Sequence, residues 1–324
     1  MTTTAPSEDD DIRPDDTLEY KLAKDIRAAA ATLTHTQARF AVDRYYQLQK
    51  DRIGTHSQIR AIEEKSEEGG LGDEPHALLD AIATRNADLE GSIKLALGIY
   101  AKASPLGRWA LSVKGVGPVI SAGLVANIDI SVCPTVGHIW AFAGLDPTKR
   151  WAPKTKRPWN ARLKVLTTYK LGESFVKVQG REGAIYGQVF AARKRLEWER
   201  NLAGEFAAQA EVKAKAVGDG TTAIKWYSGA VDPGWARATL ESGAGWPEKM
   251  PAAAASSSNF PMLPPAHIHS RARRYAVKLF LSHYHYVGYR ILHGTPPPLP
   301  YILTQEGGHA HFIAPPNIDD IENL

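Results

Sequence analysis

The feature that most constrains the fold is a regular spacing of apolar residues between positions 79 and 100. The positions recur alternately every three and four residues, and they are Leu79, Ile82, Asn86, Leu89, Ile93, Ala96 and Tyr100. This spacing is typical of a helix packed lengthwise on another helix, with Asn86 as the polar position that can set the register. The preceding segment offers a matching stripe at Ala38, Ala41, Tyr45 and Leu48. We therefore expect a helical hairpin, or coiled coil, that closes on itself or on a second copy of the chain.

The remaining sequence also favours helices, so the expected fold class is all-α. Helical spacing covers residues 18–31, 34–65, 75–103, 160–170, 184–216 and 270–292, with several short helices between 105 and 144. The last long helix should be apolar on most sides, with Arg271, Arg274, Lys278 and His285 on one outward face. A small terminal β-hairpin could pair Tyr301–Thr304 with His309–Ile313.

Composition divides the chain into five segments. Residues 1–17 form an acidic tail that should be disordered, and residues 18–104 form the helical hairpin. Residues 105–216 form a second helical domain, 217–266 a Gly/Ala/Pro-rich insertion, and 267–324 a C-terminal helix and tail that pack on the core. The sequence lacks a long apolar run and a signal peptide, so no membrane span is expected and the predicted location is cytoplasmic.

Charge is distributed unevenly along the chain, although the formal net charge is only +4. Residues 101–164 contain ten bases and two acids, and residues 267–293 contain five bases and no acid. Two basic surfaces on one protein indicate a polyanionic partner such as DNA. The alternative is a solvated basic face with no partner.

The turn at Lys114-Gly115-Val116-Gly117 is the clearest local motif. Apolar helical segments flank it, and Pro118 stands where the second helix should begin. The pattern is typical of a helix-hairpin-helix element. In such an element, glycines that can take positive φ let a phosphate approach the backbone amides, and Lys114 adds charge. Alternatively, the two glycines only allow the helices to pack closely.

Downstream of the turn, a basic segment alternates cations with two tryptophans. It contains Lys149, Arg150, Trp151, Lys154, Lys156, Arg157, Trp159, Arg162 and Lys164. The cations can neutralise phosphates, and the rings can stack on unpaired bases or fill the core beneath the loop. Arg271, Arg274 and Lys278 would extend the same basic surface.

Together with the Gly-Val-Gly turn, the block Ala141-Phe-Ala-Gly-Leu-Asp-Pro147 resembles the C-terminal domain of DEDD-type insertion-sequence transposases. The likeness covers about residues 105–200 and implies a DNA-holding helical domain that follows a coiled coil. Two parts of that family's chemistry are missing here. Residues 1–104 are not the metal-binding ribonuclease-H-like domain, and no Ser-Gly nucleophile follows the block. Thr155 is a weak catalytic candidate, because it is the only hydroxyl well inside the loop.

Histidines cluster near the C-terminus in His-x-His pairs. Zinc binding through His267, His269, His309 and His311 would need both pairs in extended conformation, so packed or hydrogen-bonded histidines are the favoured interpretation. His283 should lie in the core of the last helix. No cofactor is otherwise expected.

These observations favour a protein that binds duplex or branched DNA, and the coiled coil would allow it to form a homodimer. One alternative is an active transposase or recombinase with an unrecognised nucleophile or a catalytic domain from a partner. The other is a structural coiled-coil scaffold.

Overall fold

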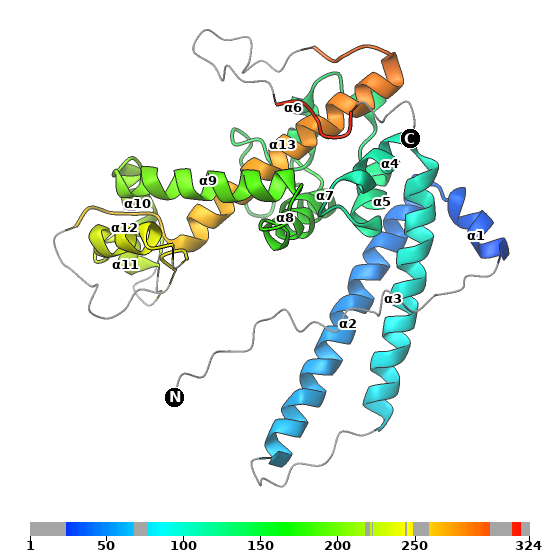
Figure 1. Ribbon diagram of the computed structural model, residues 1–324, viewed down its shortest axis with the longest axis horizontal. Helices are drawn as coiled ribbons and strands as arrows, with labels where there is room; N and C mark the ends of the chain where they lie inside the picture. Colours follow the sequence, from blue (N-terminus) through cyan, green and yellow to red (C-terminus); the bar gives the residue numbers. More distant parts are fainter. Residues whose placement is uncertain are drawn as a thin grey trace. The chain divides into compact units, whose positions relative to one another are not determined.

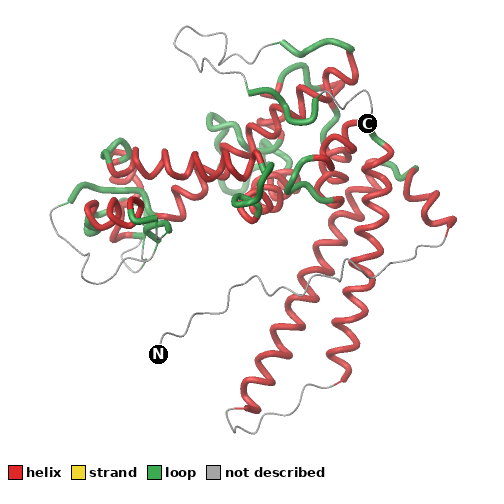
Figure 2. The backbone as a smooth tube through the Cα atoms, in the orientation of Figure 1, coloured by secondary structure: helices red, strands yellow, loops and turns green. Residues whose placement is uncertain are grey.

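The computed structural model describes residues 24–67, 77–217, 221, 223–243, 245–248, 259–298 and 313–318. Every regular element in these ranges is a helix, and none of them contains a strand (Figure 2). The predicted all-α class is therefore confirmed. The proposed terminal β-hairpin lies outside the described residues, apart from Ile313.

The chain forms two compact units. Unit 1 comprises the described residues up to Ile139 together with those from Tyr284 onward, and unit 2 comprises Trp140–His283. The division falls inside two helices, α6 (Val136–Phe142) and α13 (Pro265–His293).

The helical hairpin of unit 1 is formed by α2 (His35–Glu67) and α3 (Ala77–Ala103), which lie side by side (Figure 1). A shorter helix, α1 (Lys24–Ala31), contacts α3. Thr34 and Gln37 cap the start of α2 reciprocally. The Gln37 amide donates to Thr34 Oγ1 at 3.2 Å, and the Thr34 amide donates to Gln37 Oε1 at 2.8 Å. The predicted hairpin is confirmed, and its first helix starts directly after Thr34, as expected.

The seam of the hairpin is displaced by one residue from the predicted seam. Ala83, Glu90 and Leu97 are buried, whereas Ile82 and Leu89 are 41% and 53% exposed. Small residues explain the shift, because α3 also packs on α5 (Pro118–Asn127) and the Cα of Gly98 faces Pro118. A strict three-four count cannot detect this second partner.

A buried ion pair takes the place of the polar position expected at Asn86. Arg52 Nε donates to Glu90 Oε2 at 2.8 Å, and the two side chains are 2% and 0% exposed. Gln49 adds a longer bond to the other carboxylate oxygen. Such a pair adds little net stability, but losing one partner costs about 3–5 kcal/mol. It therefore penalises any other register of α2 on α3.

The rest of unit 1 packs around Trp109, on α4 (Pro105–Ser112). The Trp109 indole N–H donates to the Pro316 carbonyl at 2.8 Å, and its ring lies 6.2 Å from that of Tyr284. A short 3-10 helix, Ile130–Val132, follows α5, and Asp129 caps it. The C-terminal turn of α13 passes closely over this region, because a Cβ on Gly288 would meet Ile130 and Leu106.

Unit 2 begins with α7 (Ala161–Lys164), a π-helix (Val165–Leu171) and α8 (Gly172–Lys177). The long helix α9 (Ile185–Leu202) follows, and then α10 (Ala207–Ala214), α11 (Ile224–Tyr227) and α12 (Pro233–Glu241). An aromatic core that includes Trp198, Phe206 and Trp226 joins α9 to α12 with the start of α13. The segment expected as an insertion thus contains two helices.

The helix α13 starts at Pro265, five residues before the predicted Ser270. Two of its histidines are buried. His283 Nδ1 shares a 2.7 Å hydrogen bond with Tyr186 Oη in unit 2, as expected for a core residue. His285 was expected on the outward basic face, and this was wrong: it is 3% exposed and bonds the Cys133 carbonyl in unit 1 at 2.8 Å. Helical spacing alone does not show whether a polar side chain is exposed or is buried with a hydrogen bond to the backbone.

Candidate nucleic-acid interface

The turn between α4 and α5 anchors its valines and turns its remaining residues outward. Val113 and Val116 are 5% and 6% exposed, whereas Lys114 is exposed. Gly115 takes φ +96°, in the region that favours glycine. The Val116 amide donates to the Val113 carbonyl at 3.0 Å and closes the turn. The Val116 amide is therefore used inside the turn, and the outward side presents the two glycines and Lys114.

Gly117 is the N-cap of α5, with φ −89° and ψ 175°. The prediction that it could need positive φ is wrong, because this extended conformation is open to any residue. A Cβ built on Gly117 meets nothing within 4 Å, and no side chain among the described residues caps this helix end. The space beside Gly117 is therefore open, and the positive end of the α5 dipole lies there.

In unit 2, residues 151–157 form a loop closed by its own hydrogen bonds. The Trp151 indole N–H donates to the Thr155 carbonyl at 2.8 Å, and Thr155 Oγ1 donates to the Ala152 carbonyl at 2.7 Å. Lys154 takes φ +65° at the tip, and Arg157 lies over the Trp151 ring at 5.1 Å. The Thr155 hydroxyl thus serves the loop, and no described base activates it as a nucleophile.

Trp159 and Lys164 meet above Gly144, which has φ +66°. The Lys164 amine lies 4.2 Å from the centre of the Trp159 ring. A Cβ on Gly144 would lie 2.9 Å from both Trp159 Cγ and Lys164 Cδ. Burial, together with the charges of Arg274 and Arg157, lowers the pKa of Lys164. Cations from three parts of unit 2 therefore act on one another here.

The other cations of the basic segment are exposed. They are Lys149, Arg150, Lys154, Lys156 and Arg162. Asp146, which precedes them, accepts hydrogen bonds from the Thr148 amide and hydroxyl at 2.9 and 2.7 Å. These bonds lower the pKa of Asp146, so this carboxylate organises the start of the segment.

The basic residues of α13 have unequal surroundings. Arg274 is exposed, whereas Lys278 is half-buried with its amine 4.0 Å from the centre of the Trp140 ring. Arg271 donates to Glu197 Oε2 at 2.6 Å, and Glu197 is 1% exposed. The charge of Arg271 is therefore paired with that of a buried carboxylate.

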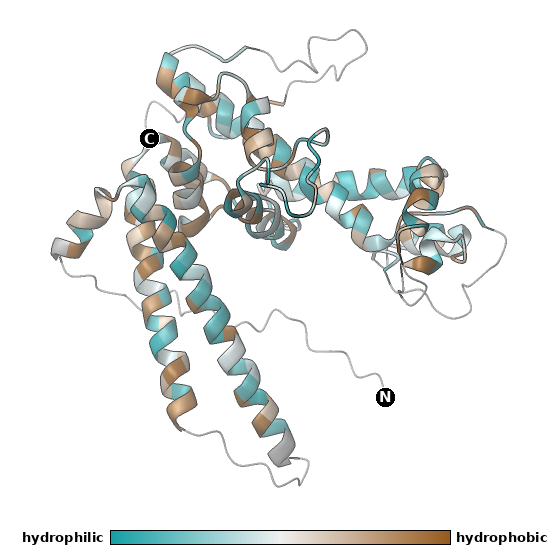
Figure 3. Cartoon of the chain, turned by 180° about the vertical axis from the view of Figure 1, so that it is seen from behind, coloured by the Kyte–Doolittle hydropathy of each residue, from teal (hydrophilic) through white to brown (hydrophobic). Residues whose placement is uncertain are grey.

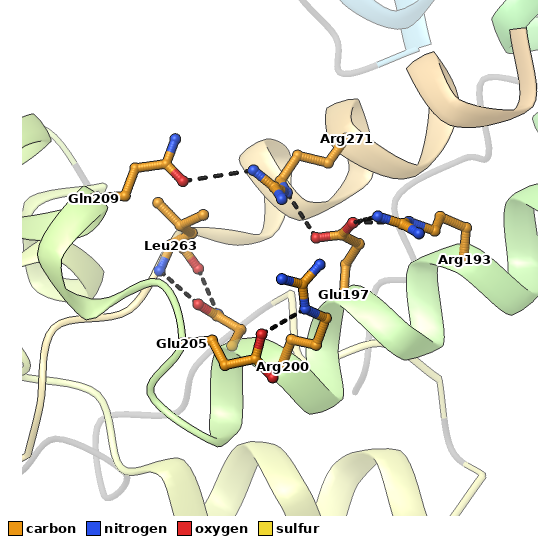
Figure 4. A network of polar contacts seen from close by, with 8 residues as sticks. Arg193, Glu197, Arg200, Glu205, Gln209, Leu263 and Arg271 are labelled. Atoms are coloured by element: carbon orange, nitrogen blue, oxygen red, sulfur yellow. Dashed lines mark hydrogen bonds and ion pairs between the residues drawn. The ribbon is translucent and has the colours of Figure 1, made fainter. Parts of the chain in front are cut away.

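Sequence reasoning missed the network around Glu197. Arg193 contacts Glu197 Oε1 at 2.6 Å in an i, i+4 pair, and Arg271 reaches Glu197 from α13 (Figure 4). Burial alone would raise the pKa of Glu197, but the hydrogen bond and charge of Arg271 and the charge of Arg193 lower it. The i, i+4 spacing of Arg193 and Glu197 was the only signal that the sequence offered.

The zinc hypothesis is weakened by the start of α13. His267 and His269 are helical rather than extended, so they point to different sides of the helix. Burial, followed by the charges of Arg274, Arg271 and Lys213, lowers the pKa of His267 to about 4. No group of three metal-ligating side chains occurs among the described residues, and His309 and His311 lie outside them.

The likeness to transposases is confirmed by a family comparison. Residues 108–164 match the model of the Transposase IS116/IS110/IS902 family, so this segment is a domain of that family. The match includes the α4–α5 turn, the Gly144 block and the whole basic segment. No curated protein and no solved structure is significantly similar to the chain. None of the described helices is long and apolar enough to cross a membrane.

Proposed function

We propose that this protein binds DNA mainly through phosphates, with the α4–α5 turn and the basic segment as two contact regions. The observation that carries the proposal is the uncapped, unobstructed N-terminus of α5 at Gly117, inside a transposase-family domain. A phosphate fits such a helix end, because the backbone amides of the first turn and the positive end of the helix dipole both favour an anion. Lys114 and Gly115 border the same spot.

The basic segment supplies the larger electrostatic contribution. Its exposed cations are Lys149, Arg150, Lys154, Lys156, Arg157 and Arg162, and Arg274 is an exposed cation of α13 in the same unit. Each phosphate that they neutralise releases counterions, so affinity should depend steeply on salt. Lys278 and Arg271 are left out of the proposed interface, because the carboxylates of Asp146 and Glu197 respectively act on them.

A duplex titration over a range of salt concentrations tests the proposal. If about six cations engage phosphates, log K should fall against log salt with a slope of about −5. A slope shallower than about −2, or no binding at low salt, would contradict it. Junction and single-stranded DNA in the same assay would show whether branched substrates are preferred.

The helical hairpin supports a second copy of the chain as a partner. Leu78, Ile82 and Leu89 are 60%, 41% and 53% exposed, and hydrophobic positions extend along α3 as far as its first turn (Figure 3). These residues belong to the predicted seam or adjoin it, yet they are turned away from α2. Light scattering should therefore give twice the monomer mass, and Leu89→Glu should return it to that of a monomer.

Two other functions remain as alternatives. An active recombinase could use a catalytic domain from a partner or an unrecognised nucleophile such as Thr155, the only hydroxyl well inside the basic loop. Cleavage or strand transfer of a supercoiled plasmid would reveal it. A coiled-coil scaffold would keep the dimer but show no salt-dependent DNA binding.

A further inference from the structure

The three tryptophans between residues 140 and 159 share one arrangement, because each carries a cation on the face of its ring. The distances from cation to ring centre are 5.1 Å for Arg157 on Trp151, 4.2 Å for Lys164 on Trp159 and 4.0 Å for Lys278 on Trp140. A ring face occupied by a cation is not available to a base on that side. The pairing also restricts the cation to one direction.

The first pair is fixed by its own loop. The indole N–H of Trp151 is bound to the Thr155 carbonyl, and the Thr155 hydroxyl is bound to Ala152. Turning the ring outward to insert between bases would break the indole hydrogen bond and move the ring away from Arg157. The loop is thus arranged to hold the arginine.

The pair of Trp159 and Lys164 is held in place by Gly144 and by Asn160. Gly144 leaves just enough room for the Trp159 ring and the Lys164 stem. Asn160 follows the ring directly; its amide donates to the Phe142 carbonyl at 2.9 Å, and its side chain caps α7 through the amides of Arg162 and Leu163. The helix that carries Lys164 is therefore fixed relative to Trp159.

Charge distinguishes these two pairs from the third. Burial lowers the pKa of both Lys278 and Lys164, but the neighbouring charges differ. The carboxylate of Asp146 acts in the opposite sense on Lys278 and favours its charged form. The charges of Arg274 and Arg157 repel Lys164 and lower its pKa further. An added phosphate would relieve the repulsion at Lys164, whereas it would compete with Asp146 at Lys278.

We propose that Trp151 and Trp159 serve as supports that hold Arg157 and Lys164 against the phosphodiester backbone of duplex DNA, rather than as rings that stack on bases. The inference rests on the proposed DNA-binding function and specifies its ligand. A duplex offers regularly spaced phosphates and buried bases, whereas base stacking on aromatic rings is typical of single-strand binders.

A double-mutant cycle on the full chain tests this inference. We would measure the affinities of the parent, Lys164→Met, Trp159→Leu and the double variant for a duplex and for a single strand of the same length. Lys164→Met should weaken duplex binding about five- to tenfold and reduce the salt slope by about 0.9. Trp159→Leu should have a similar effect, and the double variant should be no worse than Lys164→Met, because the ring acts through the cation.

The matched control is Lys278→Met, on the third tryptophan, which should change duplex affinity less than twofold. Melting curves would show whether Trp159→Leu is folded, and Lys164→Met, which keeps the aliphatic stem, provides the second variant. Selective loss of single-strand binding in Trp159→Leu, with Lys164→Met unchanged, would overturn the inference in favour of stacking. Unchanged duplex binding in every variant would overturn it while leaving the proposed function intact. Failure of the parent to bind any duplex would instead remove the proposed function.

Discussion

The two candidate contact regions differ in the kind of group that they offer to DNA. The α4–α5 turn in unit 1 presents backbone amides around Gly117, and Lys114 is the cation beside them. The segment 149–164 in unit 2 presents side-chain cations, two of which lie on the faces of tryptophan rings. Binding of a phosphate by backbone amides requires close approach and depends little on salt concentration. Binding by side-chain cations depends on charge, and therefore on salt, and only loosely on the shape of the surface. Variants of the α4–α5 turn should therefore lose DNA affinity with little change in salt dependence, whereas variants of the segment 149–164 should lose both.

Neutralising the basic segment should have the largest effect. Changing Lys149, Arg150, Lys154 and Lys156 together to glutamine removes four exposed cations of the segment. The salt slope should become shallower by about 3.6, and affinity at 0.1 M salt should fall about a thousandfold. Titrations at several salt concentrations measure both quantities. An unchanged slope would exclude the segment from the interface.

Arg271 and Arg274 lie three residues apart on α13 and should behave in opposite ways. Arg271→Met leaves the buried Glu197 with one partner fewer, so the free energy of unfolding should fall by about 3 kcal/mol. Arg274→Met removes an exposed cation, so it should lower DNA affinity and leave stability nearly unchanged. Denaturant unfolding and duplex titration of both variants check this. Equal stability losses would show that Arg274 is also structural.

Lys114→Gln should have a smaller effect. It removes one exposed cation beside the Gly117 amides, so duplex affinity should fall tenfold or less and about equally for every sequence. The measurement is a titration with several unrelated duplexes. A loss confined to one sequence would mean that Lys114 reads a base.

Thr155→Val should have the smallest effect. The Thr155 hydroxyl donates to the Ala152 carbonyl within its own loop, and that carbonyl also accepts from the Thr155 amide. DNA affinity should change less than twofold, and any plasmid cleavage by the parent should persist. Abolished cleavage with intact binding would identify Thr155 as the nucleophile after all.

Much of the fold could be predicted from the sequence, because its signals are local. Helical spacing placed α2 and α3 to within a few residues, and the Gly-Val-Gly-Pro block placed the turn between α4 and α5. The displaced seam of α3 and the buried His285 could not be predicted, since each depends on a partner far away in the sequence. The same holds for the site: its cations are visible in the sequence, whereas the pairing of Lys164 with Trp159 and of Arg271 with Glu197 requires the folded chain.

The Gly117→Ala variant tests most directly whether the α4–α5 turn binds DNA. A Cβ at this position meets no protein atom within 4 Å, and φ −89° suits alanine, so the melting temperature should be unchanged. The added methyl group lies where a phosphate would approach the amides of α5. We expect duplex affinity to fall about tenfold with no change in the salt slope beyond about one unit. A folded variant that binds duplex as tightly as the parent would contradict the account, because the turn would then serve packing alone.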